Sequence, residues 1–228
     1  MKILICTGIY PPDIGGPAIY AKNLYDTFIK LGHKAKVYSY RTEKSLPIGI
    51  RHIFFFFKIL PQIALSDVVL ALDTFSVGLP SVLAARLFRK KIVIRVGGDF
   101  LWEGYVERTG EKVLLRNFYK TRKEKFDFKE KMIFHLTRWS LVNNKAIIFS
   151  TSWQKDIFVK AYGLDSRKVA VVENFYGKKL DSYNPEKKDF VAGTRPLKWK
   201  NLDRLSSVFS KIQEKNPEIM LDLETAPY

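Results

Sequence analysis

Short apolar runs rich in Val and Ile alternate with longer amphipathic segments along most of the chain. The apolar runs predict strands at residues 2–8, 34–40, 67–72, 90–96, 145–150 and 168–174. The amphipathic segments predict helices at residues 18–31, 50–65, 76–88, 110–142 and 152–162. Strands that alternate with helices in this way form a parallel sheet with helices on both faces. The predicted fold class is therefore α/β, beginning with a doubly wound, Rossmann-like domain.

A second domain is predicted near the C-terminus. Residues 177–188 are polar and contain Asn184-Pro185, as is typical of a surface linker. A new strand, helix and strand follow at residues 189–194, 201–215 and 219–224. One such unit cannot cover its own apolar faces. We therefore expect an N-terminal domain at residues 1–180, and a linker with the start of a truncated second Rossmann-like domain at 181–228.

The composition predicts a folded protein with anionic partners. Hydrophobic residues make up 46% of the chain, and 39 Lys and Arg against 23 Asp and Glu give a net charge of +16. Such a charge favours nucleic acid, acidic lipid or phosphorylated small molecules. The sequence contains no helix-turn-helix, RNA-recognition or zinc pattern, and its cations are scattered. Nucleic acid is therefore the least favoured of the three partners.

The sequence predicts a cytoplasmic protein. Its single cysteine, Cys6, excludes an internal disulfide and lies in an apolar run, where we expect an inert core thiol. No signal-peptide pattern follows Met1. The most apolar segment, residues 53–65, is interrupted by Lys58 and Pro61 and is shorter than the ~20 residues of a spanning helix.

The turn between the first strand and the first helix contains a glycine pair, Gly15-Gly16, followed by Pro17. Backbone N–H groups at a helix N-terminus bind anions, and glycine lets a ligand approach them closely. A plain loop, with Pro17 starting the helix, explains the same residues equally well. A dinucleotide site needs G-x-G-x-x-G and an acidic residue that ends the second strand, and neither is present.

Four segments of the sequence, in order, resemble glycosyltransferase family 4, whose members have the GT-B fold. They are residues 11–40 with "PPDIGGPAIYAKNL", 66–103 with "VGGDFLWE", 150–176 with "STSWQKDIF", and 191–212 with "AGTRPLKWK". The resemblance implies two facing Rossmann-like domains, with the nucleotide-diphosphate sugar held mainly by the C-terminal one and the acceptor by the N-terminal one. It also implies sugar transfer with retention of configuration, without a metal or other cofactor.

The resemblance assigns donor-phosphate binding to two sets of residues. Gly15 and Gly16 match the loop that faces the donor phosphates, so the anion site becomes the favoured interpretation of this turn. Arg195 and Lys200 match the Arg and Lys that grip the diphosphate, although Thr194 stands where a glycine is usual. An ordinary solvated basic loop is the alternative for this second pair.

Two acidic residues after the fourth predicted strand are candidate catalytic residues. Asp99 and Glu103 lie in "VGGDFLWE" at the carboxyl edge of the sheet, where open α/β sheets bind ligands. Many members of the family carry a sugar-contacting histidine where this chain has Gly97, and some relatives use a G-D-x-x-W-E form instead. One hypothesis is that Asp99 orients a sugar hydroxyl, and a helix cap or a turn-stabilising role explains its position at least as well.

Two basic, aromatic segments suggest a membrane surface as a further partner. Residues 51–60 combine four consecutive phenylalanines with flanking cations, and residues 116–139 add more basic and aromatic side chains. Interfacial helices have this composition, but so does a helix buried against a sheet. The first interpretation predicts contact with an anionic membrane, peripheral at its inner face, or with a lipid-linked acceptor.

The predicted function is the acceptor-side portion of a retaining glycosyltransferase of the hexosyltransferase type, acting on a glycan or lipid-linked acceptor. The family's paired glutamates for the donor would lie beyond residue 228, so we expect weak activity from this chain alone. A separately encoded C-terminal half would be a natural partner. The alternative is a non-catalytic module that binds sugar, membrane or a protein.

Overall fold

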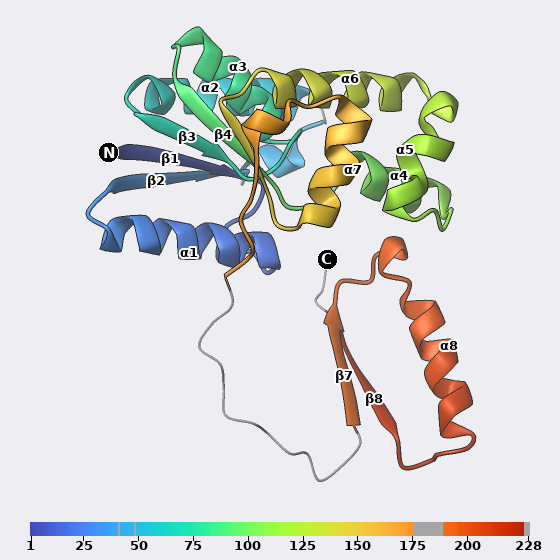
Figure 1. Ribbon diagram of the computed structural model, residues 1–228. Helices are drawn as coiled ribbons and strands as arrows, with labels where there is room; N and C mark the ends of the chain where they lie inside the picture. Colours follow the sequence, from blue (N-terminus) through green and yellow to red (C-terminus); the bar gives the residue numbers. More distant parts are fainter. Residues whose placement is uncertain (41, 48, 176–188, 226–228) are drawn as a thin grey trace. The chain divides into compact units, whose positions relative to one another are not determined.

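The computed structural model describes residues 1–40, 42–47, 49–175 and 189–225. The chain divides into two units (Figure 1). The first comprises Met1–Leu101 and Leu115–Phe175, and the second comprises Trp102–Leu114 and Tyr176–Tyr228. The predicted linker and the predicted boundary at residues 180 and 181 lie outside the described residues, so that boundary stays a prediction.

The first unit is built on a six-stranded parallel sheet. Its strands are β1 (Lys2–Thr7), β2 (Lys34–Ser39), β3 (Val68–Ala71), β4 (Lys91–Val96), β5 (Ala146–Phe149) and β6 (Val169–Val171). Their spatial order is β2-β1-β3-β4-β5-β6, and each neighbouring pair is parallel. The order reverses direction between β1 and β3, which makes the sheet doubly wound and confirms the predicted α/β class.

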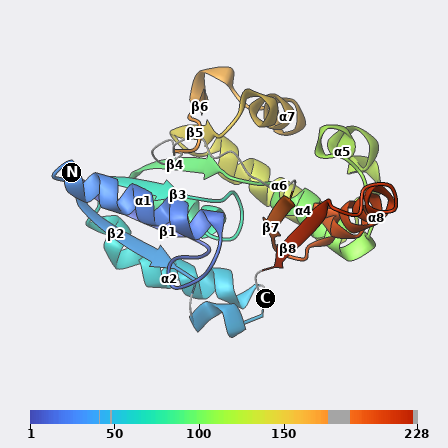
Figure 2. The same cartoon turned by 90° about the horizontal axis from the view of Figure 1, so that it is seen from below.

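Helices of the first unit cover both faces of this sheet. They are α1 (Gly16–Lys30), α2 (Ile50–Ala64), α3 (Gly78–Leu87), α5 (Leu115–Thr121), α6 (Phe128–Val142) and α7 (Ser152–Tyr162), with short 3-10 turns at Thr42–Ser45, Lys123–Lys125 and Ser166–Lys168. Helix α1 lies on one face, whereas α2, α3 and α6 lie on the other (Figure 1, Figure 2). Helix α4 (Phe100–Thr109) begins in the first unit, and its residues from Trp102 onward belong to the second.

The core lies around the central strands and the face that α3 covers. In β1 every residue after Lys2 is buried, including Cys6, whose pKa burial raises to about 12. The thiol is therefore protonated at neutral pH, as expected of an inert core cysteine. Strand β4 alternates differently, because Ile92 and Ile94 are buried whereas Val93 between them is half-buried. The pleat thus points Val93, and with it Arg95, to the side opposite Ile92 and Ile94.

Several helix ends follow their sequence signals. The Asp127 side chain accepts from the Glu130 backbone N–H while the Glu130 side chain accepts from that of Asp127, which forms a capping box at the start of α6. The Thr151 hydroxyl oxygen accepts from the Gln154 backbone N–H at the start of α7, and Gly163 ends this helix in the left-handed conformation. These local caps explain why α7 has the bounds that the sequence predicts.

The segment after β4 departs from the prediction. A helical pattern was expected only from Gly110 onward, but α4 already begins at Phe100 and ends before Gly110, which adopts a positive φ of 70°. The predicted single helix at 110–142 is instead divided into α5, a 3-10 turn and α6. The hydrophobic periodicity of this basic segment is irregular, so the sequence pattern did not reveal where α5 ends and α6 begins.

Helix α2 is apolar on two sides. Phe55, Ile59 and Ile63 are fully buried, whereas Ile53 is 60% and Phe57 63% exposed. The buried face fits a helix packed against the sheet, and the membrane interpretation of the exposed face stays a prediction. No helix among the described residues is long and apolar enough to span a membrane.

The second unit contains the predicted strand, helix and strand. Strands β7 (Asp189–Thr194) and β8 (Met220–Thr225) pair in parallel, and α8 (Leu202–Gln213) connects them. A 3-10 turn at Lys198–Lys200 precedes α8. Phe190 of β7 and Phe209 of α8 pack edge to face at 5.3 Å between ring centroids, which ties the helix to the two strands.

We expect the substitution Gly78→Ala to destabilise the first unit. A Cβ at Gly78 would lie 2.4 Å from the backbone carbonyl oxygen of Asp73, which has no room to move because the Asp73 carboxylate is bonded into the same turn. Overpacking of this kind costs about 1–3 kcal/mol. Urea denaturation measures the free energy of unfolding. Gly49→Ala is the control, because a Cβ at Gly49 meets nothing within 4 Å; an equal effect of both changes would contradict the expectation.

Candidate functional site

The carboxyl ends of β1, β3 and β4 carry the loops that the sequence analysis singled out. The strand order reverses between β1 and β3, and open α/β sheets bind ligands at such a switch point. The turn with Gly15 and Gly16 follows β1, the Asp73 loop follows β3, and Gly97 and Asp99 follow β4. The topology therefore gathers these loops at one edge of the sheet.

The glycine pair lies at the start of α1, and the backbone conformation requires glycine at one of its two positions. Gly15 precedes the helix with a φ of 151°, and a Cβ there would come 3.1 Å from the Ile9 side chain. Gly16 has no such constraint, since a Cβ on it would meet nothing within 4 Å. No side chain caps α1. Pro17 has no N–H and the Ala18 N–H donates to the Gly15 carbonyl, so the N–H that the first turn leaves for a ligand is that of Gly16. Open space beside this N–H is the geometry of an anion site.

The Asp73 loop is held by its own carboxylate. Asp73 Oδ1 accepts hydrogen bonds from the backbone N–H groups of Phe75, Val77 and Gly78 at 3.0–3.1 Å. Burial raises the pKa of this carboxyl, and the same N–H groups oppose the rise. These bonds fix the turn into α3, so the role that the geometry gives Asp73 is to shape the sheet edge.

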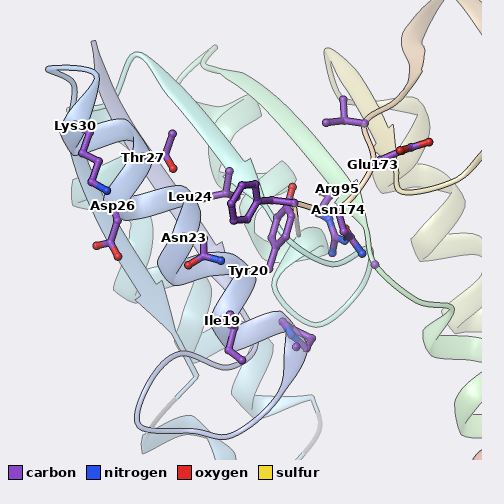
Figure 3. Close-up of a pocket in the computed structure, with 15 residues that line it drawn as sticks. Ile19, Tyr20, Asn23, Leu24, Asp26, Thr27, Lys30, Arg95, Glu173 and Asn174 are labelled. Atoms are coloured by element: carbon purple, nitrogen blue, oxygen red, sulfur yellow. Dashed lines mark hydrogen bonds between the residues drawn. The ribbon is translucent and has the colours of Figure 1, made fainter. Parts of the chain in front are cut away.

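A groove of about 760 Å³ lies beside α1 at this edge (Figure 3). Residues of α1, of the end of β4 and of the segment that follows β6 line it: Gly16, Pro17, Ile19, Tyr20, Asn23, Leu24, Asp26, Thr27, Lys30, Arg95, Gly97, Val172, Glu173, Asn174 and Phe175. All of them belong to the first unit. The groove thus contains one of the two predicted glycines, Gly16, and neither Asp99 nor Glu103.

Arg95 is the buried charged residue of this groove lining, and the sequence analysis did not identify it. Its residue is only 6% exposed. The guanidinium carbon lies 3.9 Å from the ring centroid of Tyr20, and Nη2 donates to Asn174 Oδ1 at 2.5 Å (Figure 3). Burial lowers the pKa of the guanidinium from its ordinary value, although an arginine remains protonated at neutral pH.

Gly97 makes room for Arg95. A Cβ at position 97 would lie 2.5 Å from Arg95 Nη1, closer than any real contact of this kind. The space that Arg95 needs is therefore a local physical reason for a glycine at position 97, where many members of the resembled family carry a histidine. The sequence did contain one sign of this buried arginine, which is a cation within the apolar strand run "KIVIRV". Because side chains alternate along a strand, this cation lies on the same side as Val93.

Asp99 is buried in a network with two tyrosines. The Tyr119 hydroxyl donates to Asp99 Oδ2 at 2.7 Å and lies 2.7 Å from the Tyr162 hydroxyl. Asp99 is 3% exposed. Its burial and its bond to Tyr119 fit the joining of the β4 loop to α5 and α7 better than contact with a sugar. The predicted catalytic role of Asp99 stays a prediction, with this geometry against direct contact.

Glu103 is half-buried in the first turn of α4, where a negative charge suits the helix dipole. It belongs to the second unit, as do Arg195 and Lys200. Arg195 and Lys200 are both exposed, and Lys200 Nζ lies 4.3 Å from the ring centroid of Trp199. The two cations are therefore available to a ligand of the second unit. That they face Gly15 and Gly16 across a cleft stays a prediction.

Comparison with known proteins shows what fold this chain has. No family model matches the sequence, and no curated protein matches it. Among solved structures, a Listeria monocytogenes protein with a proposed assignment as UDP-N-acetylglucosamine 2-epimerase is similar, with 16% identity and a TM-score of 0.60 over 97% of this chain and 61% of its own. This chain has the GT-B fold. It spans about three fifths of that protein's length.

Two further structures of the same fold contain nucleotide sugars. UDP-GlcNAc 2-epimerase of Neisseria meningitidis, bound to UDP-GlcNAc, is 13% identical with a TM-score of 0.58, over 100% of this chain and 67% of its own. Arabidopsis thaliana UGT89C1, complexed with UDP-L-rhamnose, is 11% identical with a TM-score of 0.52, over 99% and 69%. At these identities the likeness concerns the fold, and membership of glycosyltransferase family 4 stays a prediction.

The tyrosine network predicts a pH dependence of stability. Burial and then the charge of Asp99 raise the pKa of Tyr119 well above its ordinary value of 10.0. Because the folded state holds this proton more tightly than the unfolded state, the stabilisation is complete below pH 10 and is lost as the pH rises above it. The free energy of unfolding should fall there by about 1.4 kcal/mol per pH unit for each such tyrosine.

Urea denaturation of the wild type and of Tyr119→Phe between pH 9 and pH 11 checks this dependence. Tyr119→Phe should be less stable at pH 9, because Asp99 and Tyr162 lose a hydrogen-bond partner, and its curve should then approach that of the wild type as the pH rises. Parallel curves over this range would show that Tyr119 titrates alike in both states.

Proposed function

We propose that this chain is the acceptor-side portion of a retaining glycosyltransferase that uses a nucleotide-diphosphate sugar. The observation that supports this most directly is the groove at the sheet edge, which combines the uncapped N-terminus of α1 with open space at Gly16. The GT-B fold, found in the UDP-sugar enzymes described above, supports the same class of donor. Glycan or lipid-linked hydroxyl groups would be the acceptors.

The chemistry asks for positive charge around the leaving group. The bond between the anomeric carbon and the diphosphate oxygen breaks, the acceptor hydroxyl forms the new bond on the same face of the sugar, and its proton is released. The departing diphosphate gains negative charge, which cations and fixed N–H donors stabilise. In this proposal Gly15 and Gly16 offer N–H groups from the first unit, and Arg195 and Lys200 offer cations from the second.

The similar epimerases define the competing outcome. Epimerisation at C2 of UDP-GlcNAc would use the same donor but no acceptor, so the two activities separate by product. Incubation of the full chain with UDP-GlcNAc, with and without a mixture of glycan acceptors, followed by mass spectrometry, distinguishes them. A new glycan mass supports transfer, and a UDP-ManNAc product without transfer would replace it with epimerisation.

We expect the double substitution Arg195→Ala with Lys200→Ala to lower affinity for UDP by about tenfold or more, because two charge-assisted contacts to phosphate would be lost. Isothermal titration calorimetry with UDP measures this change. Arg204→Ala with Lys211→Ala is a matched control, since it also removes two exposed cations from the second unit, both of them in α8. An equal loss in both double variants would show only an effect of net charge.

A membrane surface is a second candidate partner, because α2 carries an exposed apolar face. Ile50, Ile53, Phe54 and Phe57 line a shallow apolar surface together with Lys58, whose Nζ is paired with Glu43 at 2.6 Å. All four of these apolar side chains are at least 50% exposed. Apolar side chains beside cations are the composition of helices that lie in the interface of an anionic bilayer.

Flotation with vesicles tests this second candidate. Phe54→Ser with Phe57→Ser should reduce binding to vesicles of phosphatidylcholine and phosphatidylserine at least tenfold, since burying one phenylalanine contributes about 1.5–3 kcal/mol. Leu31→Ser with Leu87→Ser is the control, because both leucines are 65% exposed and lie outside α2. Wild-type protein that stays unbound with acidic lipid present would remove the candidate.

A further inference from the structure

We propose that Arg95, together with the first turn of α1, binds a phosphate group of the substrate in the groove beside α1. The inference rests on the proposed function in one respect, since that function supplies phosphate either from the nucleotide diphosphate or from a phosphorylated acceptor. It goes beyond it by naming an arginine that no comparison identifies and by placing the anion in the first unit.

The first observation is a buried charge with no countercharge. Arg95 forms no ion pair with a carboxylate among the described residues, and its Nε is buried without a hydrogen-bond partner. Its neighbours, Tyr20 and Asn174, are neutral. They orient the guanidinium plane, but they cannot neutralise it. An uncompensated buried charge is costly, so a charge kept here fits an anion that arrives with the ligand.

The second observation is that the β4 loop is shaped around the guanidinium. Position 97 lacks a Cβ, and one would collide with Arg95 Nη1. Tyr20 covers one face of the guanidinium at 3.9 Å, and Asn174 occupies Nη2. Nε is buried, so a ligand would meet the guanidinium at its terminal nitrogen atoms. The end formed by Nη1 and Nη2 matches the oxygen spacing of phosphate.

The third observation is the helix start on the same groove. Gly16 and Pro17 line the groove together with Arg95 and Gly97. The Gly16 N–H lies at the positive end of a 15-residue helix. Open space at Gly16 would let an oxyanion reach this N–H. Arg95 and the helix start thus act on one ligand from two elements.

The acidic residues of the groove do not oppose this assignment. Asp26 is paired with Lys22, whose Nζ lies 2.6 Å from Asp26 Oδ2. Glu173 is exposed to solvent, where its charge is screened. Lys30 adds a further cation to the lining. The only buried charge of the lining is therefore the positive one, within the described residues.

Calorimetry on the full chain tests the proposal with inorganic pyrophosphate, UDP, UDP-GlcNAc and glucose 1-phosphate as probes. Arg95→Gln should lower affinity for phosphate about tenfold or more, because charge-assisted contacts are lost. Gly16→Ala should weaken binding without disturbing the protein, since its Cβ would occupy only the open space. Gly97→Ala should also weaken binding, because the added Cβ would displace the guanidinium of Arg95 without removing its charge.

Two controls separate a specific site from general effects. Arg116→Gln removes one exposed cation from the same unit, and Gly49→Ala adds a methyl group in open space away from the groove. Both should bind the probes as the wild type does. In the absence of ligand, Arg95→Met should unfold at the same temperature or a higher one, since it removes an uncompensated charge. A purely structural arginine would give a lower unfolding temperature with unchanged affinity, which overturns the proposal.

The probes also identify the source of the phosphate. Dependence on Arg95 for UDP and pyrophosphate assigns the site to the donor, and dependence for glucose 1-phosphate alone assigns it to a phosphorylated acceptor. If pyrophosphate binds through Arg95 but UDP-GlcNAc does not bind, this inference stands and the proposed function fails. If UDP-GlcNAc binds and Arg95→Gln changes nothing, or if no phosphate probe binds better to wild type than to Arg95→Gln, the inference falls.

Discussion

The stacking of Arg95 on Tyr20 holds a positive charge against the sheet where no carboxylate in the described part of the chain pairs with it. The contact is close, at 3.9 Å from the guanidinium carbon to the ring centroid, and a desolvated cation–π contact contributes about 2 kcal/mol or more. That contribution offsets part of the cost of burial but leaves the net charge in place. The groove, the missing Cβ at Gly97 and the role of Asn174 all depend on where this one guanidinium lies.

The sheet topology explains why the charge is at this place. Strand β4 buries Ile92, Ile94 and Val96 on the side of α3, so the pleat points Arg95 to the side of α1. The reversal of strand order between β1 and β3 brings the start of α1 to the same edge. The chain that leaves β6 then supplies Asn174. Three segments that are far apart in the sequence thus meet around one side chain.

The sequence predicts the architecture well because its signals are local. The strand runs, the cap at Thr151 and the stop at Gly163 lie within a few residues of the elements they define, and β7 has the predicted bounds. The site could be predicted only in part. The glycine pair is recognisable from the sequence because its role depends on local backbone conformation. Arg95, in contrast, is one of 39 cations. Its burial depends on Tyr20 and Asn174, which lie 75 and 79 positions away. The burial of Asp99 likewise depends on tyrosines that no local pattern connects to it.

The net charge of +16 is a weaker guide to function than the position of one charge. Exposed cations such as Arg195 and Lys200 interact through water, and salt screens them over about 10 Å. They raise the encounter rate with any anion, which is why the total charge could not separate nucleic acid, lipid and phosphate. A buried guanidinium is screened far less and accepts only a ligand that fits its fixed plane. Selection for one anion among many therefore rests on a residue that contributes a single unit to the total.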